Sequence, residues 1–526
     1  MIPWLTQRAA ATRGATALEV GDDVVSFAEL ATSVHDTALR LRAAGVREGD
    51  VLATLLWNGR AFVEALHAAI SCGAALLPLN ARATAAELAF VLRDASVRLV
   101  IHGAGQLAAL AHDATRRAGG VACAEAAVDP AATLACVQDA GCAEGLATGG
   151  VARCETTAGA GHAAAREAGA PLLVSTDPER ILAIVYTSGT TGRPRGALLA
   201  LRSLLASAAA SALHLGASAS DRWLACLPLF HVGGLAILVR SVLTGSAVVL
   251  HERFDARAVC AALDERAITH VSLVPTMLSR VLDAWGDRSA PSTLSCVLVG
   301  GAAAPLGLLD RARRLGFPVA PTYGLTEAAS QVATLPPGAA VEGDRAAGWP
   351  LPGVEIRIVS EAGTVLAAGE AGEICVRGAT LMAGYLGLPE ASAKALRGGW
   401  LHTGDIGVLG ADGALRVLDR RSDLVVSGGE NVYPAEVEAI LAAHPGVAEA
   451  AVAGEPDPDL GQRVVAGVVL REGARTDAEA LRAHCRAHLA GYKVPRRIAL
   501  LDELPRTSSG KLLRRAIVSE LGAGLA

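Results

Sequence analysis

The sequence predicts an α/β fold with two domains, and three observations support that prediction. Short apolar runs rich in Val, Ile and Leu alternate with segments whose apolar residues keep helical spacing, a pattern typical of parallel-sheet layers. The chain has 526 residues, too many for one compact core. Strand after strand ends in Gly, Pro, His or Glu. Because ligands bind beyond the carboxyl ends of parallel strands, we expect these ends to face one crevice.

The N-terminal part supplies the first alternating elements. Ser26 and Glu29 have the spacing of a capping box, which predicts a helix that runs to Gly45. Further strands are expected over 51–56, 74–79 and 97–101, with helices over 61–71 and after the second capping box, Thr84 and Glu87. Residues 104–175 are rich in Ala, Gly and Cys, and we expect a variable surface excursion there without an assigned function.

Residues 186–196, YTSGTTGRPRG, follow a predicted strand over 181–186 and precede a predicted helix over 198–213. Glycines let the backbone curl so that successive N–H groups converge on an anion, while hydroxyls and arginines add donors and positive charge. The string therefore predicts a phosphate loop, although it is not a Walker loop. The alternative is a Ser/Thr/Gly surface loop between a strand and a helix.

Later strands lead into further polar or glycine-rich stretches. We expect these strands at 223–227, 248–251, 270–273, 297–299 and 319–321. The stretches that follow strands are PLFHVGG (228–234), VPT (274–276), GGAA (300–303) and YGLTE (323–327).

The last part of the chain changes pattern. From Val354 the sequence predicts a small hairpin-like β region, which WLHTGD (400–405) and DRRSD (419–423) close. After Asp419 it predicts a compact α/β unit with a helix after Pro434, strands near 447–453, 464–470 and 497–501, and a helix near 477–489. We therefore expect a large domain over 1–419 and a small one over 420–526.

Composition limits the classes of partner. A net charge of −5 gives no reason to expect nucleic acid or an anionic membrane as a partner. The longest apolar stretch, Leu235 to Leu250, is interrupted by Arg240, so no membrane span is expected. Ten cysteines without CxxC pairs, in a chain with no apolar signal core, fit reduced thiols and a cytoplasmic location. The sequence leaves open whether the chain forms homo-oligomers.

Five motifs in order resemble those of the adenylate-forming superfamily, which includes acyl- and aryl-CoA ligases, adenylation domains and luciferases. They are YTSGTTGRPRG, YGLTE, WLHTGD, DRRSD (419–423) and TSSGKLLRR (507–515). Two departures stand out: Arg195 occupies a position where the family usually has Lys, and the Thr-His-x-Asn that often follows the loop is absent. The resemblance implies a mobile C-terminal domain, with ATP, Mg²⁺, CoA and a small-molecule carboxylic acid as ligands.

The resemblance also implies roles for individual residues. ATP and AMP binding would fall to Thr187, Ser188, Gly189, Thr190, Thr191, Gly192, Gly301, Ala302, Tyr323, Gly324, Thr326, Asp405 and Arg420. Tyr323 would stack on adenine, Asp405 would bind the ribose hydroxyls, and Glu327 would hold Mg²⁺ through hard carboxylate oxygens. Lys511, His231, Arg195 and Glu327 would be the catalytic residues, and the lysine would stabilise charge that develops between the acid and the α-phosphate. Asp419 would be the hinge, and Gly428 and Gly429 would line the CoA tunnel.

Several strings, including DRWLACLPLFHVGGL (221–235), have a closer resemblance to the CoA ligases of menaquinone biosynthesis, which act on o-succinylbenzoate. Acid binding would then involve His231, Arg240 and Thr276. A charge inside an apolar run is costly unless it is paired, so Arg240 is a candidate partner for a substrate carboxylate. The alternative is an arginine that reaches the surface or pairs with a structural carboxylate.

Other functions remain open at this point. The acid could be a fatty or simple aromatic acid, or the enzyme could load an acid onto a carrier-protein thiol instead of CoA. A nucleotide-binding sensor on an inactive scaffold is the non-enzymatic alternative. The presence of Glu327, Asp405, Arg420 and Lys511 argues against the sensor.

Overall fold

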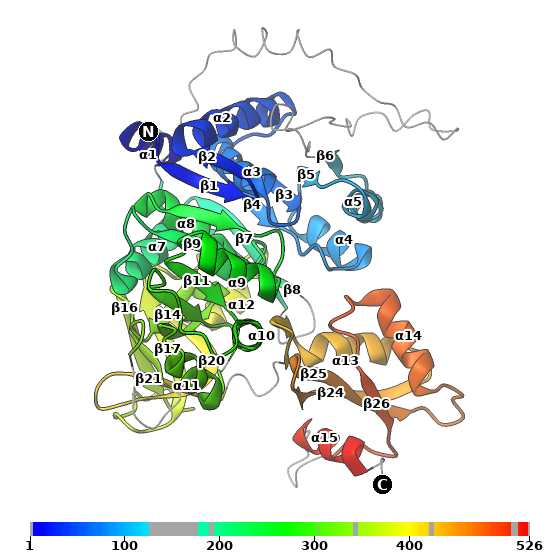
Figure 1. Ribbon diagram of the computed structural model, residues 1–526. Coiled ribbons are helices and arrows are strands. Elements are labelled where there is room, and N and C mark those ends of the chain that lie inside the picture. The colour runs from blue at the N-terminus through cyan, green and yellow to red at the C-terminus, as the bar shows by residue number, and fades with distance from the viewer. Residues whose placement is uncertain are drawn as a thin grey trace, which may run out of the picture.

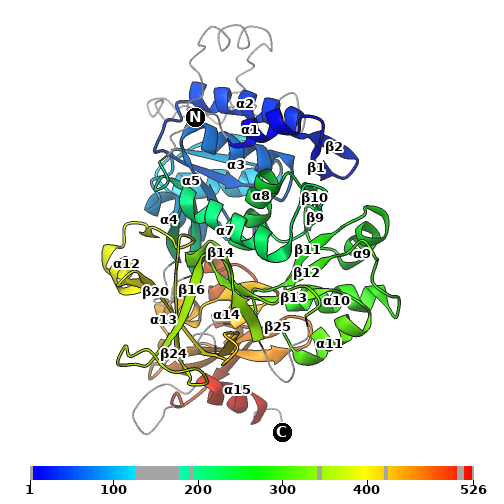
Figure 2. The same cartoon turned by 90° about the vertical axis from the view of Figure 1, so that its left-hand side faces the viewer.

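The computed structural model describes residues 4–125, 177–188, 194–302, 304–339, 346–419, 425–505 and 514–523. These residues form three sheets with helices packed on them, in the mixed α/β architecture that the sequence predicts. Figures 1 and 2 place α1 (Trp4–Ala11) and α2 (Phe27–Ala43) at the opposite end of the molecule from α15 (Arg514–Ala523).

The first sheet has seven strands and holds most of the predicted N-terminal elements. Its order is β18-β8-β7-β4-β3-β5-β6, and all neighbours are parallel except at β8 and β18. The strands are β3 (Val51–Leu55), β4 (Ala75–Pro78), β5 (Leu99–His102), β6 (Ala122–Glu125), β7 (Ile181–Ser188), β8 (Pro194–Ala200) and β18 (Gly384–Tyr385). The helices α3 (Arg60–Cys72), α4 (Ala85–Asp94) and α5 (Gln106–Arg117) alternate with these strands.

Helices cover both faces of this sheet. Leu52 of β3 packs in one core with α2 and α3, whereas the neighbouring Ala53 packs in another core with α4 and α5. This arrangement explains why the strands read as continuous apolar runs. Both capping boxes form, with Ser26–Glu29 at the start of α2 and Thr84–Glu87 at the start of α4.

The second sheet has fourteen strands and is mixed. Its central order β10-β9-β11-β12-β13 is parallel, and antiparallel strands continue from β13 onward. The strands are β1 (Thr16–Val20), β2 (Asp23–Ser26), β9 (Arg222–Ala225), β10 (Ala247–Leu250), β11 (His270–Leu273), β12 (Cys296–Val299), β13 (Val319–Leu325), β14 (Ser330–Thr334), β15 (Ala346–Pro350), β16 (Val354–Val359), β17 (Gly372–Gly378), β19 (Leu396–Arg397), β20 (Trp400–Leu409) and β21 (Leu415–Asp419).

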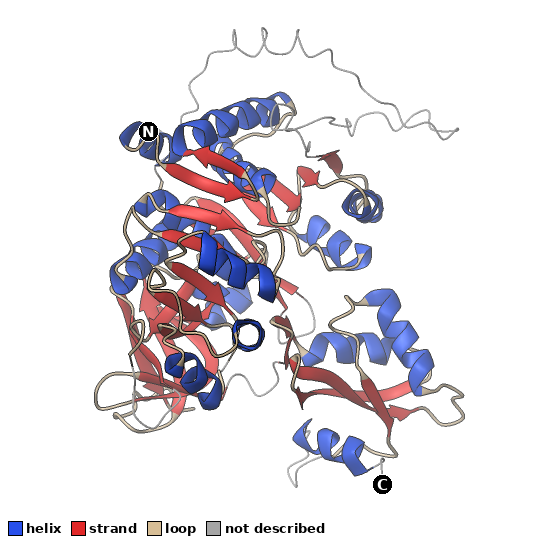
Figure 3. Cartoon of the chain, in the orientation of Figure 1, coloured by secondary structure: helices blue, strands red, loops and turns tan. Residues whose placement is uncertain are grey.

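The helices of this central part alternate with the parallel strands, as Figure 3 shows in blue and red. They are α7 (Leu201–Leu215), α8 (Val232–Thr244), α9 (Ala256–Glu265), α10 (Pro275–Trp285), α11 (Leu306–Arg314), α12 (Pro389–Ala395) and the 3₁₀ helix η1 (Thr326–Ala328). The carboxyl ends of the parallel strands therefore lie at one edge of the sheet, the edge at which α8 and η1 begin.

The C-terminal part is a separate five-stranded sheet, drawn in orange and red in Figure 1. Its strands are β22 (Val425–Ser427), β23 (Glu430–Val432), β24 (Val447–Asp457), β25 (Gly461–Leu470) and β26 (Arg497–Leu500), and its first helices are α13 (Pro434–Ala443) and α14 (Ala478–His488). Val452 of β24 packs against α13 and α14, whereas Ala451 packs against α15, so helices cover both faces.

Three expectations need correction. Residues 198–200 belong to strand β8, which pairs antiparallel with β7, so the helix begins only at Leu201. The seven-stranded sheet is largely parallel as expected, but the fourteen-stranded sheet is mixed, because antiparallel strands continue it from β13 onward. The segment 104–175 contains α5 and β6, because an Ala-rich stretch can form a helix without strong apolar periodicity; residues 126–175 lie outside the described part.

Candidate active site

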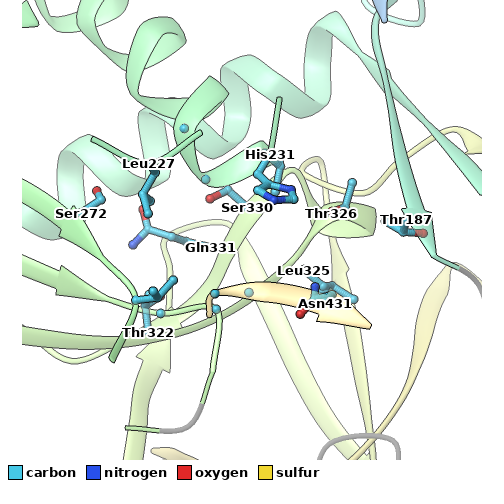
Figure 4. Close-up of a pocket in the computed structure, with 18 of the residues that line it drawn as sticks. Thr187, Leu227, His231, Ser272, Thr322, Leu325, Thr326, Ser330, Gln331 and Asn431 are labelled. Carbon is cyan, nitrogen blue, oxygen red and sulfur yellow. The ribbon is translucent and has the colours of Figure 1, made fainter. Parts of the chain in front are cut away.

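A pocket opens where the carboxyl ends of the central strands meet the turn between β22 and β23. Figure 4 shows His231, Ser330 and Gln331 around this space, while Thr187 comes from β7 and Asn431 from β23. The pocket brings together ten residues that the sequence singles out: Thr187, His231, Arg240, Gly301, Gly324, Thr326, Glu327, Asp405, Gly428 and Gly429. Elements from both ends of the chain thus build one site.

A second cavity adjoins the first, and the two share Val274, Thr322 and Gly429 in their linings. This cavity is lined by three further candidates for the nucleotide and the acid, Ala302, Tyr323 and Thr276. The candidates therefore line two adjoining spaces that share part of their walls. Thr276 faces the second cavity and is not in the lining of the pocket that holds His231 and Arg240.

Several candidates lie outside the described residues: Gly189, Thr190, Thr191, Gly192, Arg420 and Lys511. The residues on either side of the loop are described. Ser188, the last residue of β7, pairs with Pro194 at the start of β8, so the ends of the loop meet in an antiparallel ladder. Asp419, the proposed hinge, ends β21 and pairs with Ile406 of β20.

Tyr385 connects two of the catalytic candidates. Its hydroxyl donates a hydrogen bond of 2.7 Å to Oε1 of Glu327, and the guanidinium carbon of Arg195 lies 5.6 Å from the centre of its ring. The Glu327 carboxylate is thereby oriented at the wall of the pocket, whose lining also includes the hydroxyl-bearing residues Thr326 and Thr187. Mg²⁺ prefers hard oxygen ligands and commonly takes one carboxylate together with phosphate oxygens, so this donor set fits the ion.

Tyr323 and Asp405 are also joined directly. The Tyr323 hydroxyl donates a hydrogen bond of 2.6 Å to Oδ2 of Asp405. The adjacent Gly324 is required by backbone packing, because a Cβ atom there would lie 2.0 Å from the carbonyl oxygen of Ser330. The YGLTE motif thus places the Tyr323 ring, bonded to the Asp405 carboxylate, where the two cavities adjoin. Its glycine lets the backbone at Gly324 pass close to the backbone at Ser330.

Arg240 projects from α8 into the apolar interior and is only 2% exposed. Its guanidinium carbon lies 4.1 Å from the centre of the Trp223 ring, and Nη2 donates a 3.4 Å hydrogen bond to Oε1 of Gln331. Among the described residues, no carboxylate forms an ion pair with it, and its Nε and Nη1 atoms have no hydrogen-bond partner. Burial lowers the pKa of Arg240 to about 10, so the side chain is still a cation at neutral pH. A buried, unpaired cation in a pocket lining is costly unless an anion joins it.

His231 makes its main contact with the C-terminal part of the chain. Its Nε2 atom lies 2.9 Å from Oε2 of Glu430, and Oε1 of Glu430 accepts a 2.9 Å hydrogen bond from Arg82. Burial alone would raise the pKa of Glu430, but His231, Arg82 and Lys493 outweigh it and hold that pKa below its usual value. Glu430 is therefore a buried carboxylate between two cationic or polar groups of the N-terminal part.

The turn Gly428–Gly429 brings the small sheet to the pocket. Both residues have positive φ, +60° and +85°, which an L side chain rarely adopts. A Cβ atom on Gly429 would lie 3.1 Å from Cγ2 of Val274. The two glycines thus permit a narrow approach between the parts of the chain, as a tunnel for a slender ligand requires.

Sequence reasoning missed three residues of this site: Tyr385, Gln331 and Glu430. Tyr385 comes from strand β18, which pairs with β8 far away in the sequence, whereas Gln331 comes from β14, which pairs with the nearby strand β13. Glu430 follows Gly429 directly, and a charged residue next to a Gly-Gly turn was a signal that could have found it. None of the helices in the described part of the chain combines the length and the apolar character that a membrane span needs.

Comparison with known proteins adds independent information. The pattern of the AMP-binding enzyme family matches residues 5–386, and the pattern of the AMP-binding enzyme C-terminal domain matches residues 436–511. The chain is 42% identical over 514 residues to a 2-succinylbenzoate–CoA ligase of Geobacillus kaustophilus, which covers 98% of this chain and 96% of the relative.

Solved structures agree with that similarity. A double mutant of the o-succinylbenzoate CoA synthetase of Bacillus subtilis, bound with its product analogue OSB-NCoA, matches with a TM-score of 0.84, 37% identity and 98% of both chains. The same synthetase in complex with ATP and magnesium ion matches with a TM-score of 0.69, 36% identity, and 98% and 99% of the two chains. The arrangement of this chain is thus more similar to the product-analogue complex than to the ATP complex.

Proposed function

This chain belongs to the AMP-binding enzyme family and is an adenylate-forming CoA ligase; on that premise, we propose that its acid is 2-succinylbenzoate. The observation that supports this choice is Arg240, a buried cation in the pocket lining without a carboxylate partner among the described residues. The relatives named 2-succinylbenzoate–CoA ligases provide the second line of support.

The chemistry of the acid explains why Arg240 matters. 2-Succinylbenzoate has two carboxylates, and the succinyl carboxylate must be free to react with ATP. The ring carboxylate then enters the pocket as an anion and needs a partner, since an isolated buried charge is expensive. The two guanidinium nitrogens of Arg240 that have no partner in the described part of the chain supply that partner, and Gln331 and Trp223 keep the guanidinium in place. A plain fatty acid would leave the cation unpaired.

In the first half-reaction, a succinyl carboxylate oxygen attacks the α-phosphorus of ATP and pyrophosphate leaves. We propose that the loop Thr187–Gly192 cradles the phosphates and that Lys511 stabilises the charge on the reacting oxygens. We assign Tyr323, Asp405 and Arg420, together with Gly301 and Ala302, to the adenosine. Glu327, oriented by Tyr385, would hold Mg²⁺, which neutralises phosphate charge when it is bound. Arg195 lies beside the same tyrosine and supplies positive charge at the loop.

In the second half-reaction, the CoA thiol attacks the acyl carbon and AMP leaves. We propose that Gly428 and Gly429 line the path of the thiol-bearing arm, because their turn reaches the pocket beside Val274. His231 stands at the pocket wall with its Nε2 held by Glu430, in a position to orient the reacting carbonyl region. Both half-reactions use positioning and electrostatics rather than a covalent enzyme intermediate.

The two half-reactions need different groups at one site. We therefore propose a large domain over 1–419, a mobile domain over 420–526 and a hinge at Asp419. Rotation would exchange Lys511 for the Gly428–Gly429 turn. The higher similarity to the product-analogue complex supports the view that this structure has the orientation for thioester formation.

A substrate panel tests the proposed acid. Purified protein with ATP and magnesium is given 2-succinylbenzoate, benzoate or a medium-chain fatty acid, with and without CoA. We expect pyrophosphate release only with 2-succinylbenzoate, and thioester formation with free CoA. Preference for a fatty acid or benzoate would contradict the proposed substrate, and adenylation without transfer to free CoA would favour a carrier-loading enzyme.

A further inference from the structure

A buried ammonium group joins the two parts of the chain away from the reacting atoms. The Nζ atom of Lys493 lies 2.7 Å from Oε1 of Glu436 and 2.6 Å from Oε1 of Glu87. The Lys493 and Glu87 side chains are 9% and 12% exposed. Burial disfavours the ammonium, but Tyr492, Glu436 and Glu87 outweigh it and raise the pKa of Lys493. The lysine is therefore a firmly charged group at a nearly dry interface.

The three groups belong to different parts of the chain. Lys493 follows α14 and Glu436 lies in the first turn of α13, so these two travel together in the C-terminal part. Glu87 belongs to α4 in the N-terminal part. Of the two ion pairs that Lys493 makes, a rotation about the proposed hinge would break the one with Glu87 and keep the one with Glu436.

Glu87 is oriented by contacts within the N-terminal part that do not involve Lys493. Its Oε2 atom accepts hydrogen bonds from the backbone N–H of Thr84 at 2.7 Å and from the Thr84 hydroxyl at 2.9 Å, which completes the capping box of α4. Oε1 is the atom that binds Lys493. Because the carboxylate is already oriented by the helix terminus, little side-chain entropy is lost when the lysine binds.

Residues 80–87, the segment that contains Glu87, make further contacts to the C-terminal part. Asn80 donates a 3.1 Å hydrogen bond to the Tyr492 hydroxyl, and Arg82 donates one of 2.9 Å to Glu430. Glu430 in turn holds His231 at the pocket. The ion pair of Lys493 thus belongs to the same interface as the contacts of Arg82 and Glu430 that extend to the pocket.

We propose that Lys493 and Glu87 form a positioning pair that holds the C-terminal part in the orientation that transfers the acyl group to CoA. This inference rests on the proposed two-step function, but it does not depend on which acid is used. The pair contributes nothing to adenylation, because the Lys493 ammonium lies with Glu87 and Glu436 rather than at the pocket.

The variant Glu87→Gln tests the pair with little disturbance. Glutamine also completes a capping box at this position, so α4 keeps its cap while the charge is lost. The matched control is Glu29→Gln, which makes the same change in the capping box of α2, where the carboxylate binds Ser26. Lys493→Met removes the other member, and the double variant measures their coupling.

The measurement separates the half-reactions in single-turnover experiments. We expect Glu87→Gln to slow thioester formation from the acyl-adenylate at least tenfold while adenylation stays within about twofold of wild type. Glu29→Gln should change neither rate, and the double variant should be no slower than Lys493→Met alone. Equal slowing of both half-reactions, unchanged thioester formation, or additive losses in the double variant would overturn the proposal.

A second measurement needs no substrate, so it separates this proposal from the identity of the acid. Hydrogen exchange in the full chain is followed over residues 478–494 for wild type, Glu87→Gln and Glu29→Gln. We expect exchange to be at least severalfold faster in Glu87→Gln alone. Equal exchange in all three proteins would contradict the positioning pair. Failure of wild type to adenylate 2-succinylbenzoate would overturn only the proposed acid.

Discussion

The Nε2 atom of His231, at the N-terminus of α8, lies 2.9 Å from Oε2 of Glu430, in the strand that follows the Gly428–Gly429 turn. This contact ties a side chain of the acid pocket to the C-terminal part of the chain. Arg82 binds the other oxygen of the same carboxylate. The approach of the C-terminal part is therefore coupled to the position of the imidazole at the pocket wall.

Glu430→Gln should impair the second half-reaction selectively. The amide keeps the size of the side chain but removes the charge that His231 and Arg82 share. We expect thioester formation to slow about tenfold or more, since hydrogen bonds to a buried charged group are worth roughly 1.5–3 kcal/mol. Pyrophosphate release should remain near the wild-type rate. Slower adenylation in this variant would mean that Glu430 acts in both steps.

Lys511→Ala should show the opposite pattern. If Lys511 stabilises the developing charge in adenylation, its loss should slow that step by on the order of 10²–10³. Thioester formation from a supplied acyl-adenylate should stay close to wild type, because the lysine would then be away from the site. The two rates are measured separately, and an equal loss in both would count against the exchange of groups.

Asp419→Pro tests the proposed hinge. Proline fixes φ near −65° and removes the backbone N–H, so one orientation of the C-terminal part should be trapped. One half-reaction should persist while the other collapses, as measured by pyrophosphate release and by CoA thioester formation. Normal rates for both steps would place the pivot at another residue.

His67 predicts how stability depends on pH. It is buried in α3, its Nδ1 has no hydrogen-bond partner among the described residues, and burial lowers its pKa from 6.5 to about 4. Between pH 4 and pH 6.5 the unfolded chain therefore binds more protons than the folded chain. The contribution of neutral His67 to the free energy of unfolding is complete above about pH 6.5 and is lost as the pH falls toward 4. The full effect is about 3 kcal/mol. Denaturant unfolding of wild type and His67→Gln from pH 7 to pH 5 should show a shallower pH dependence in the variant, and parallel curves would refute this assignment.

The parts that sequence reasoning predicted well depend on local rules. Both capping boxes and the strand end before Glu327 follow from short patterns, and the structure contains them, whereas β20 continues past Asp405 to Leu409. The helix predicted at Leu198 is wrong because a short apolar run does not distinguish a strand from a helix, and pairing with Ile184 of β7 makes this residue part of a strand.

The parts that sequence reasoning missed depend on distant contacts. Tyr385 meets Glu327, and Lys493 meets Glu87, only after the sheets have formed and the two parts have docked. The apolar run around Arg240 indicated a buried charge, but nothing in that run identifies Trp223 or Gln331 as its neighbours.

Arg240 is the residue on which the proposed substrate depends. Truncating one member of a buried charge pair costs about 2–5 kcal/mol, because the other member is left desolvated and alone. Arg240→Met should therefore lower kcat/KM for 2-succinylbenzoate by about 30- to 4,000-fold, at roughly 1.4 kcal/mol per tenfold. The KM for ATP should change little, since the described partners of the Arg240 guanidinium, Trp223 and Gln331, are not among the residues assigned to ATP.

The most direct measurement is a thermodynamic cycle that combines removal of the Arg240 guanidinium with removal of the ring carboxylate of the acid. kcat/KM is determined for wild type and Arg240→Met, each with 2-succinylbenzoate and with the analogue that lacks only the ring carboxylate. We expect the analogue to be a poor substrate of the wild type and to lose little more in the variant, so that the two losses are far from additive. Equal use of 2-succinylbenzoate by wild type and Arg240→Met, or losses that simply add, would contradict the pairing and leave only the general assignment as a CoA ligase.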